Sequence, residues 1–196
     1  MLHEFVQKSK DMMAEEINGI HTAFPGTIVA VDAVTGLATV RPTIKYVKPD
    51  GERIDYPQIS GVPILFPQGG GQGASIAFPV RENDGCLIVI AEQSLDFWLY
   101  GMETGTDLKF DMTNAICIPG LFQRAPGSLA VANSTDSIVL QNGGVSLVVG
   151  SGGIAINGSL TVNGSITGSS VRAGGVSLSS HTHNAPADGG QTSGPS

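Results

Sequence analysis

The sequence has 196 residues, with 10 lysines and arginines, 17 aspartates and glutamates, and a net charge of −7. This length suits one or two domains of about 150 residues, and the acidic balance gives no attraction to phosphate backbones, so a nucleic-acid partner is not expected. The N-terminus lacks the basic start and apolar run of a secretory signal, and no apolar run reaches membrane-spanning length. We therefore expect a soluble product made in the cytoplasm.

Residues 1–24 are predicted to contain one N-terminal helix. Apolar residues such as Phe5, Met12 and Ile17 recur at helical spacing among polar residues, and this stretch contains no proline. Gly19 and Pro25 then end the helical pattern.

Residues 25–120 change to short β-rich runs separated by turn signals. The predicted strands are residues 27–31, 37–46, 62–66, 75–78, 86–91 and 97–100. Five or six such strands favour a small closed barrel or a Greek-key sandwich. The glycine-rich loop at 67–73 lacks the Lys-Ser/Thr of a phosphate-binding loop and is interpreted as a flexible connection.

The two cysteines, Cys86 and Cys117, both lie in apolar, strand-like runs. A disulfide would require them to come close in space. We expect buried free thiols instead, as is usual for cysteines in apolar strands of a protein made in the cytoplasm.

The composition changes near Arg124. Only three charged residues follow Arg124, and the last aromatic residue is Phe122. The remainder therefore lacks the large rings that anchor most globular cores. We place a domain boundary near Arg124, with a linker at 121–136.

Residues 137–180 carry aliphatic side chains spaced by two, which puts each set on one face of a strand. The spaced residues are Ile138 and Leu140; Val145, Leu147 and Val149; Ile154 and Ile156; and Leu160 and Val162. Glycine-rich turns separate them, and the segments NGSLTV (157–162) and NGSITG (163–168) repeat directly. A disordered linker is the alternative, but a linker has no reason to keep this period.

One chain offers too little apolar area to close around itself, because short hairpins are marginal in water. Three chains wound around a common axis would bury every aliphatic stripe and satisfy the strand edges between subunits. We therefore predict an intertwined needle in a homotrimer.

A metal-binding tip is predicted at 181–196. His181 and His183 lie on one side of the chain if the strand continues, and three chains would bring six imidazole nitrogens, an octahedral set. Such a set suits divalent iron, nickel or cobalt better than zinc, which prefers four ligands. Two surface histidines and a frayed tail are the alternative for this segment.

The order of these parts resembles the contractile-tail spike proteins of bacteriophages, namely the membrane-puncturing spikes of the Gp138-like group and the related baseplate assembly protein V spikes. The resemblance rests on the runs VRENDGCLIVI (80–90) and SLDFWLYG (94–101), the Gly/Asn-punctuated needle, and His181-Thr182-His183. Asp84 and Gly85 stand in inverted order compared with the family's turn.

The resemblance implies an all-β homotrimer with an OB-fold barrel at 25–120, docked on the tail hub protein, and a triple-stranded β-helix at 137–180. It also implies one iron ion per trimer, held at the apex by His181 and His183 of three chains. Such a protein would be made in the host cytoplasm and sit at the baseplate tail tip of the virion, where sheath contraction drives it into the host envelope, in particular an outer membrane.

Other functions fit the sequence less well. An enzyme is not expected, because the stretch after Pro119 leaves no room for a lytic domain and holds no pair of acidic residues. A trimeric receptor-binding tail fibre or adhesin is the alternative, although it would end in a broader head. An OB-fold that binds single strands needs a basic groove, whereas Arg41, Lys45, Lys48 and Arg53 are outnumbered by acids.

Overall fold

The computed structural model describes residues 2–48, 50–102, 108–178 and 180–183. The chain divides into an N-terminal unit, Met1–Ala125, and a C-terminal unit, Pro126–Ser196. The division falls beside Arg124, where charged residues become scarce. Of the predicted tip, residues 184–196 lie outside the described residues.

The predicted N-terminal helix is present as α1 (Leu2–Gly19). Its described apolar side chains, such as Phe5, Met12 and Ile17, are exposed. Within the described part of the chain, no helix is long and apolar enough to cross a membrane.

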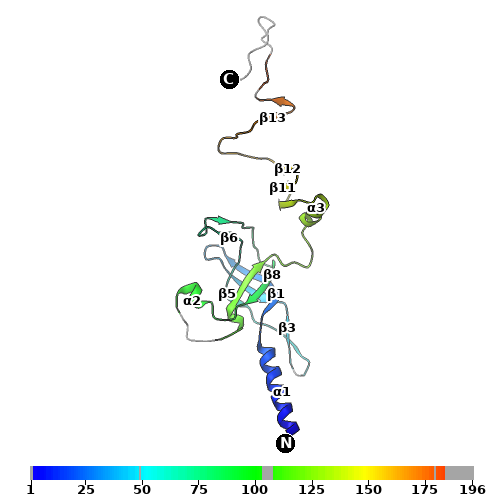
Figure 1. Cartoon of the computed structure of the whole chain (residues 1–196). Helices are drawn as coiled ribbons and strands as arrows, with labels where there is room; N and C mark the ends of the chain where they lie inside the picture. The colour runs from blue at the N-terminus through cyan, green and yellow to red at the C-terminus, as the bar shows by residue number, and fades with distance from the viewer. Residues whose placement is uncertain (1, 49, 103–107, 179, 184–196) are drawn as a thin grey trace. The chain divides into compact units, whose positions relative to one another are not determined.

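The N-terminal unit is built on a curled five-stranded sheet (Figure 1). Its strands are β1 (Ala23–Asp32), β2 (Leu37–Pro42), β5 (Ile59–Pro63), β8 (Gly85–Ile90) and β9 (Ala115–Pro119). Neighbouring strands are antiparallel, in the order β5-β2-β1-β8-β9. Just after β5, Ile64 forms an isolated parallel β-bridge with Cys117 of β9, and the Leu65 amide donates to the Cys117 carbonyl at 2.8 Å. The two sheet edges thus approach each other, giving an OB-like half-barrel and confirming the all-β prediction for this region.

The core lies inside this curled sheet, because alternate residues of each strand point inward. Its members are Phe24, Ile28, Ala38, Val40, Ile59, Val62, Cys86, Ile88, Ile90, Ala115 and Cys117. Cys86 and Cys117 are both free and 0% exposed, as predicted. A hydrogen bond to Cys86, together with burial, raises the pKa of Cys117, so this thiol stays protonated.

Short elements connect the strands of the curled sheet. They are β3 (Lys45–Val47), β4 (Arg53–Asp55), β6 (Gln68–Gly69), β7 (Ala74–Ser75), α2 (Asp96–Tyr100) and the 3-10 helix η1 (Met112–Asn114). The strand predicted at 37–46 is therefore split after Pro42, and the one predicted at 75–78 is reduced to β7. The glycine-rich loop forms the tip of the β6–β7 hairpin.

The strand predicted at 97–100 is wrong, because this segment is the helix α2. The hydroxyl of Ser94 accepts a hydrogen bond from the Asp96 amide at 3.2 Å, and Gly101 ends the helix at φ 70°, donating its N–H to Phe97. Trp98, in the middle of this helix, is 75% exposed. The large side chains at 97–100 do not alternate with polar residues, so the segment lacks the pattern that would bury one face of a strand.

The described part of the C-terminal unit contains one helix and two small sheets. Its elements are α3 (Gly127–Thr135), β10 (Ile138–Asn142), β11 (Val145–Gly150), β12 (Gly153–Asn157), β13 (Arg172–Ala173) and β14 (Val176–Ser177). The helix α3 lies inside the stretch expected to be a linker. Residues 158–171 form no strand in the single chain, so the predicted strand at Leu160 and Val162 is absent there. A lone segment has no neighbouring strand to pair with.

Candidate interchain face and metal-binding histidines

The strand register of the C-terminal unit gathers the aliphatic stripe on one face. Val149 of β11 pairs with Ile138 and with Ile154, and Leu147 pairs with Leu140 and with Ile156. Directly opposed residues share a face, and alternate residues along a strand return to it. The resulting apolar face consists of Ile138, Leu140, Val145, Leu147, Val149, Ile154 and Ile156.

The opposite face of the same sheet is more polar. Ser146 and Asn157 are paired there, and the Asn157 amide nitrogen donates to the Ser146 hydroxyl at 3.0 Å. Gln141 lies on this face too and bonds the Gly143 carbonyl at 3.1 Å. This face also carries Val139, Val148 and Ala155, so it is mixed, and its polar side chains bond locally.

Most of the apolar face is exposed in the single chain, although Leu147 and Val149 are half-buried. Ile138 is 68% exposed and Ile154 is 67% exposed, although neither carries a polar atom in its side chain. A contiguous aliphatic surface of this kind marks an interaction site, since burial stabilises by about 25 cal/mol per Å².

A glycine lets the chain pass the end of this face. Gly158 has φ 137°, and a Cβ at this position would lie 3.0 Å from Cγ1 of Val145. Only glycine combines that backbone conformation with such close approach. The Asn-Gly pair read from the sequence as a turn signal thus also protects the packing of Val145.

The hairpin β13–β14 precedes the predicted tip. Gly174 and Gly175 form its turn with φ 57° and 89°, which a two-residue hairpin requires. The Leu178 amide donates to the Val171 carbonyl at 3.0 Å, one residue beyond the register of the two strands. Val176 and Leu178 thus continue the aliphatic pattern up to the histidines.

The strand does not continue through the two histidines, because β14 ends at Ser177. His181 and His183 nevertheless lie together, with ring centroids 5.2 Å apart and an interplanar angle of 87°. The structure therefore brings together the two residues that the sequence singled out, by a turn and not by an extended strand.

Ser177 fixes the orientation of His181, a role that the sequence did not reveal. Its carbonyl oxygen accepts from the backbone amide of His181 at 3.1 Å and also lies 3.1 Å from ring Nδ1. A carbonyl can only accept, so this contact requires a proton on Nδ1, and in the neutral ring Nε2 is then the nitrogen with the lone pair. The only signal for this contact in the sequence is the spacing of four residues between Ser177 and His181, which allows a turn to bring them together.

These histidines fit a shared metal site better than a site within one chain. Within the described residues, no group of three or more His, Cys, Asp or Glu side chains could hold a metal. One chain therefore supplies two neighbouring imidazoles, one of them in the tautomer that leaves Nε2 for a metal. Further ligands would have to come from other chains.

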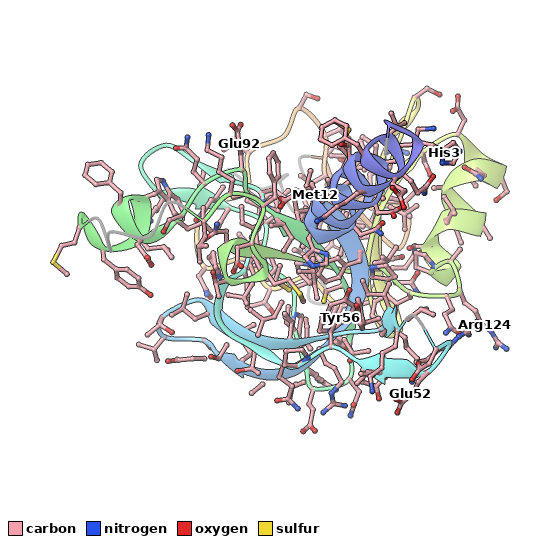
Figure 2. The ribbon with its side chains drawn as sticks, turned by 90° about the horizontal axis from the view of Figure 1, so that it is seen from below. His3, Met12, Glu52, Tyr56, Glu92 and Arg124 are labelled. Atoms are coloured by element: carbon pink, nitrogen blue, oxygen red, sulfur yellow. The ribbon has the colours of Figure 1, made fainter. Side chains whose placement is uncertain are left out.

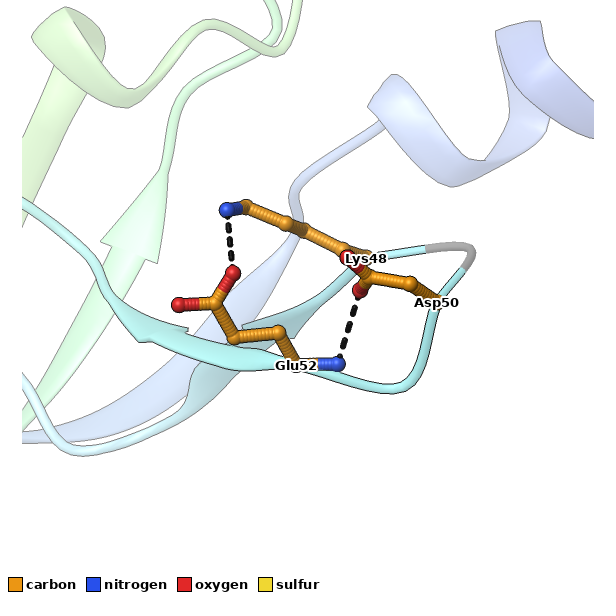
Figure 3. A network of polar contacts seen from close by, with 3 residues as sticks. All are labelled: Lys48, Asp50 and Glu52. Atoms are coloured by element: carbon orange, nitrogen blue, oxygen red, sulfur yellow. Dashed lines mark hydrogen bonds and ion pairs between the residues drawn. The ribbon is translucent and has the colours of Figure 1, made fainter.

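Of the basic residues considered for a nucleic-acid groove, Arg41 lies in β2 and the other three lie at the β3–β4 hairpin, where acids match part of their charge. Lys45 and Asp55 form an ion pair at 2.6 Å. Figure 3 shows that Lys48 pairs with Glu52, whose amide donates to the Asp50 carboxylate at 2.9 Å. Such exposed pairs contribute little stability, about 0–1 kcal/mol, but they organise the hairpin.

Comparison with known proteins identifies the curled sheet. Residues 24–120 match the family described as the phage protein Gp138 N-terminal domain. The match spans all five strands of the curled sheet and excludes α1 and the C-terminal unit. No curated protein matches the sequence.

Proposed function

Since the chain belongs, through residues 24–120, to the Gp138 family of phage proteins, we propose that it is the central spike of a phage contractile tail. In this proposal it is a structural homotrimer, not an enzyme, at the baseplate tip of the virion. Its OB-like domain docks on a tail hub protein. Sheath contraction drives its C-terminal needle into the host cell envelope.

The apolar face of β10–β12 is the observation that carries this proposal. Five of its seven aliphatic residues are exposed, and the other two, Leu147 and Val149, are half-buried. The three strands carry no aromatic residue. Two further copies of the same chain would cover this face around a threefold axis and pair the edges of β10 and β12. Chains interlocked in this way unfold slowly, which suits a part that works under load.

The histidines complete the proposed point. His181 and His183 of three chains would hold one iron ion through six imidazole nitrogens, and Ser177 would keep each His181 in the required tautomer. The bound ion supplies a crosslink between three chain ends. The C-terminal unit has no aromatic residue that could build a recognition head, which favours a spike over a receptor-binding fibre.

Native mass spectrometry with elemental analysis of the same sample tests the proposal. We expect a mass of three times the 20.1 kDa chain and about one iron per trimer. The His181→Ala/His183→Ala variant should remain trimeric and lose the iron, while His3→Ala, a control on α1, should keep it. A monomeric wild-type chain would refute the spike, and a trimer whose iron survives the double substitution would refute the tip.

A further inference from the structure

Two segments leave the curled sheet at the same end. β1 is antiparallel to both β2 and β8, so Pro42 and Ile90, the last residues of those strands, lie beside the start of β1. The Ile90 amide donates to the Thr22 carbonyl at 2.8 Å, and the Thr43 amide donates to the Pro25 carbonyl at 3.0 Å. The β3–β4 hairpin follows Pro42, and the α2 excursion, described at residues 91–102 and 108–114, follows Ile90.

The α2 excursion presents large apolar side chains to solvent. Phe97, Trp98 and Tyr100 of α2 and Met102 beyond it are all exposed. Trp98 is the single tryptophan of the chain. Its described residues are also acidic on balance, since Glu92, Asp96 and Asp111 outnumber the one described basic residue, Lys109. Aromatic anchors with charges around them are typical of the centre of a protein interface.

The β3–β4 hairpin presents a matching surface. Tyr46, Val47 and Ile54 are exposed on its two strands. Among the described residues, no ion pair involves Arg41 or Arg53, whereas both lysines of the hairpin are paired. The hairpin and the adjoining end of β2 therefore combine exposed apolar side chains with two arginines, Arg53 and Arg41, that form no ion pair among the described residues.

The two surfaces point to different sides of the N-terminal unit. In the sheet, β1 separates β2 from β8. Figure 1 shows α2 on one side of the curled sheet and β3 on the other, and Figure 2, seen from below, again places α2 opposite Glu52 of the hairpin. His21 stacks edge-on against Tyr56 at 5.6 Å, which holds the base of the hairpin beside β1.

We propose that the α2 excursion of one protomer packs against the β3–β4 hairpin of the next, around a threefold ring. This inference rests on the proposed trimer. A closed ring of three needs two different surfaces on each protomer, at one level along the axis and on different sides. The two surfaces meet both conditions when the axis runs along the length of the curled sheet.

The chemistry of the two surfaces fits one another. The exposed rings of Phe97, Trp98 and Tyr100 would cover Tyr46 and Val47 of the neighbour, and the acidic excursion would face the neighbour's Arg41 and Arg53. Arginine is the cation that stacks best on tryptophan. The ring would thus join the N-terminal units independently of the needle.

Cysteine crosslinking of the full chain tests this contact. The native thiols, both 0% exposed, give little background. Phe97→Cys combined with Val47→Cys, oxidised by copper phenanthroline, should give covalent trimers on a denaturing gel. The control combines Phe97→Cys with Val34→Cys; Val34 is exposed at the turn at the far end of β1 and should give no covalent trimer.

Quenching of Trp98 fluorescence by acrylamide supplies a second readout. In the isolated trimer we expect the quenching constant to be several-fold lower than in the denatured chain. This inference would be overturned by a trimer in which Trp98 is quenched as in the denatured chain and the Phe97/Val47 pair does not crosslink. That result would assign the exposed side chains of the α2 excursion to the hub protein and would leave the spike proposal intact. A monomer would remove both proposals.

Discussion

The carbonyl oxygen of Leu121 lies directly over Gly85, so close that a Cβ at Gly85 would sit 1.9 Å from it. The Gly120 amide also donates to the Gly85 carbonyl at 3.0 Å. The chain that leaves β9 therefore crosses the first residue of β8 in direct backbone contact. This crossing fixes where the chain departs toward the C-terminal unit.

Gly85→Ala should destabilise the N-terminal unit by about 1–3 kcal/mol or more, because backbone atoms cannot move aside as a flexible side chain can. Thermal unfolding at matched protein concentration measures the loss. Gly69→Ala is the control, since a Cβ at Gly69 meets nothing within 4 Å. Equal melting temperatures for the two variants would show that the crossing is not as tight as described.

Ile88→Ala should cost about 2–5 kcal/mol, because it removes a fully buried side chain from the centre of the curled sheet. Ile76→Ala makes the same chemical change at a side chain that is 60% exposed, and it should cost far less. Urea unfolding of both variants gives the comparison. Similar losses would place the core elsewhere.

The contribution of Asp111 to the stability of the fold should depend on pH. Its carboxylate accepts from the Thr113 hydroxyl at 2.6 Å and from the Thr113 amide at 2.8 Å, and these bonds lower the pKa of Asp111. A carboxyl group whose pKa is lower in the folded state than in the unfolded state stabilises the fold fully at pH values above its unfolded pKa of about 3.9. This stabilisation is lost as the pH falls through the pKa of the folded state.

Asp111→Ala should therefore cost about 1 kcal/mol at neutral pH, and the difference from the wild type should shrink in acid. Asp111→Asn is the control, because its amide oxygen still accepts from Thr113 but does not titrate over this range. Unfolding free energies measured across acidic and neutral pH test this. A difference that stays constant with pH would mean that the charge of Asp111 contributes nothing.

Local patterns predicted several features correctly. Helical spacing in residues 2–20 gave α1, and apolar runs placed Cys86 and Cys117 in the core. The period-two stripe in residues 138–156 became a single apolar face, because the Gly-rich turns preserve that alternation from strand to strand.

Other features depend on contacts that no local pattern records. The α2 helix is set by Ser94 and by a left-handed Gly101, whereas the large side chains between them resemble a strand. The α3 helix lies in a segment of small residues without a clear apolar stripe. The pairing of Ser177 with His181 arises from a turn, whereas the prediction for the two histidines assumed that the strand continued through them. The trimer and its metal stay predictions.

The most direct test of the spike is the solution mass of two variants that differ at neighbouring positions. Leu140 lies on the apolar face of β10, and Gln141 lies on its polar face. Sedimentation equilibrium should show a trimer for the wild type and for Gln141→Asp, and dissociation of Leu140→Asp at the same concentration, because three buried carboxylates would face the axis. A monomeric wild type, or a Leu140→Asp chain as trimeric as Gln141→Asp, would contradict the burial of this face between three chains.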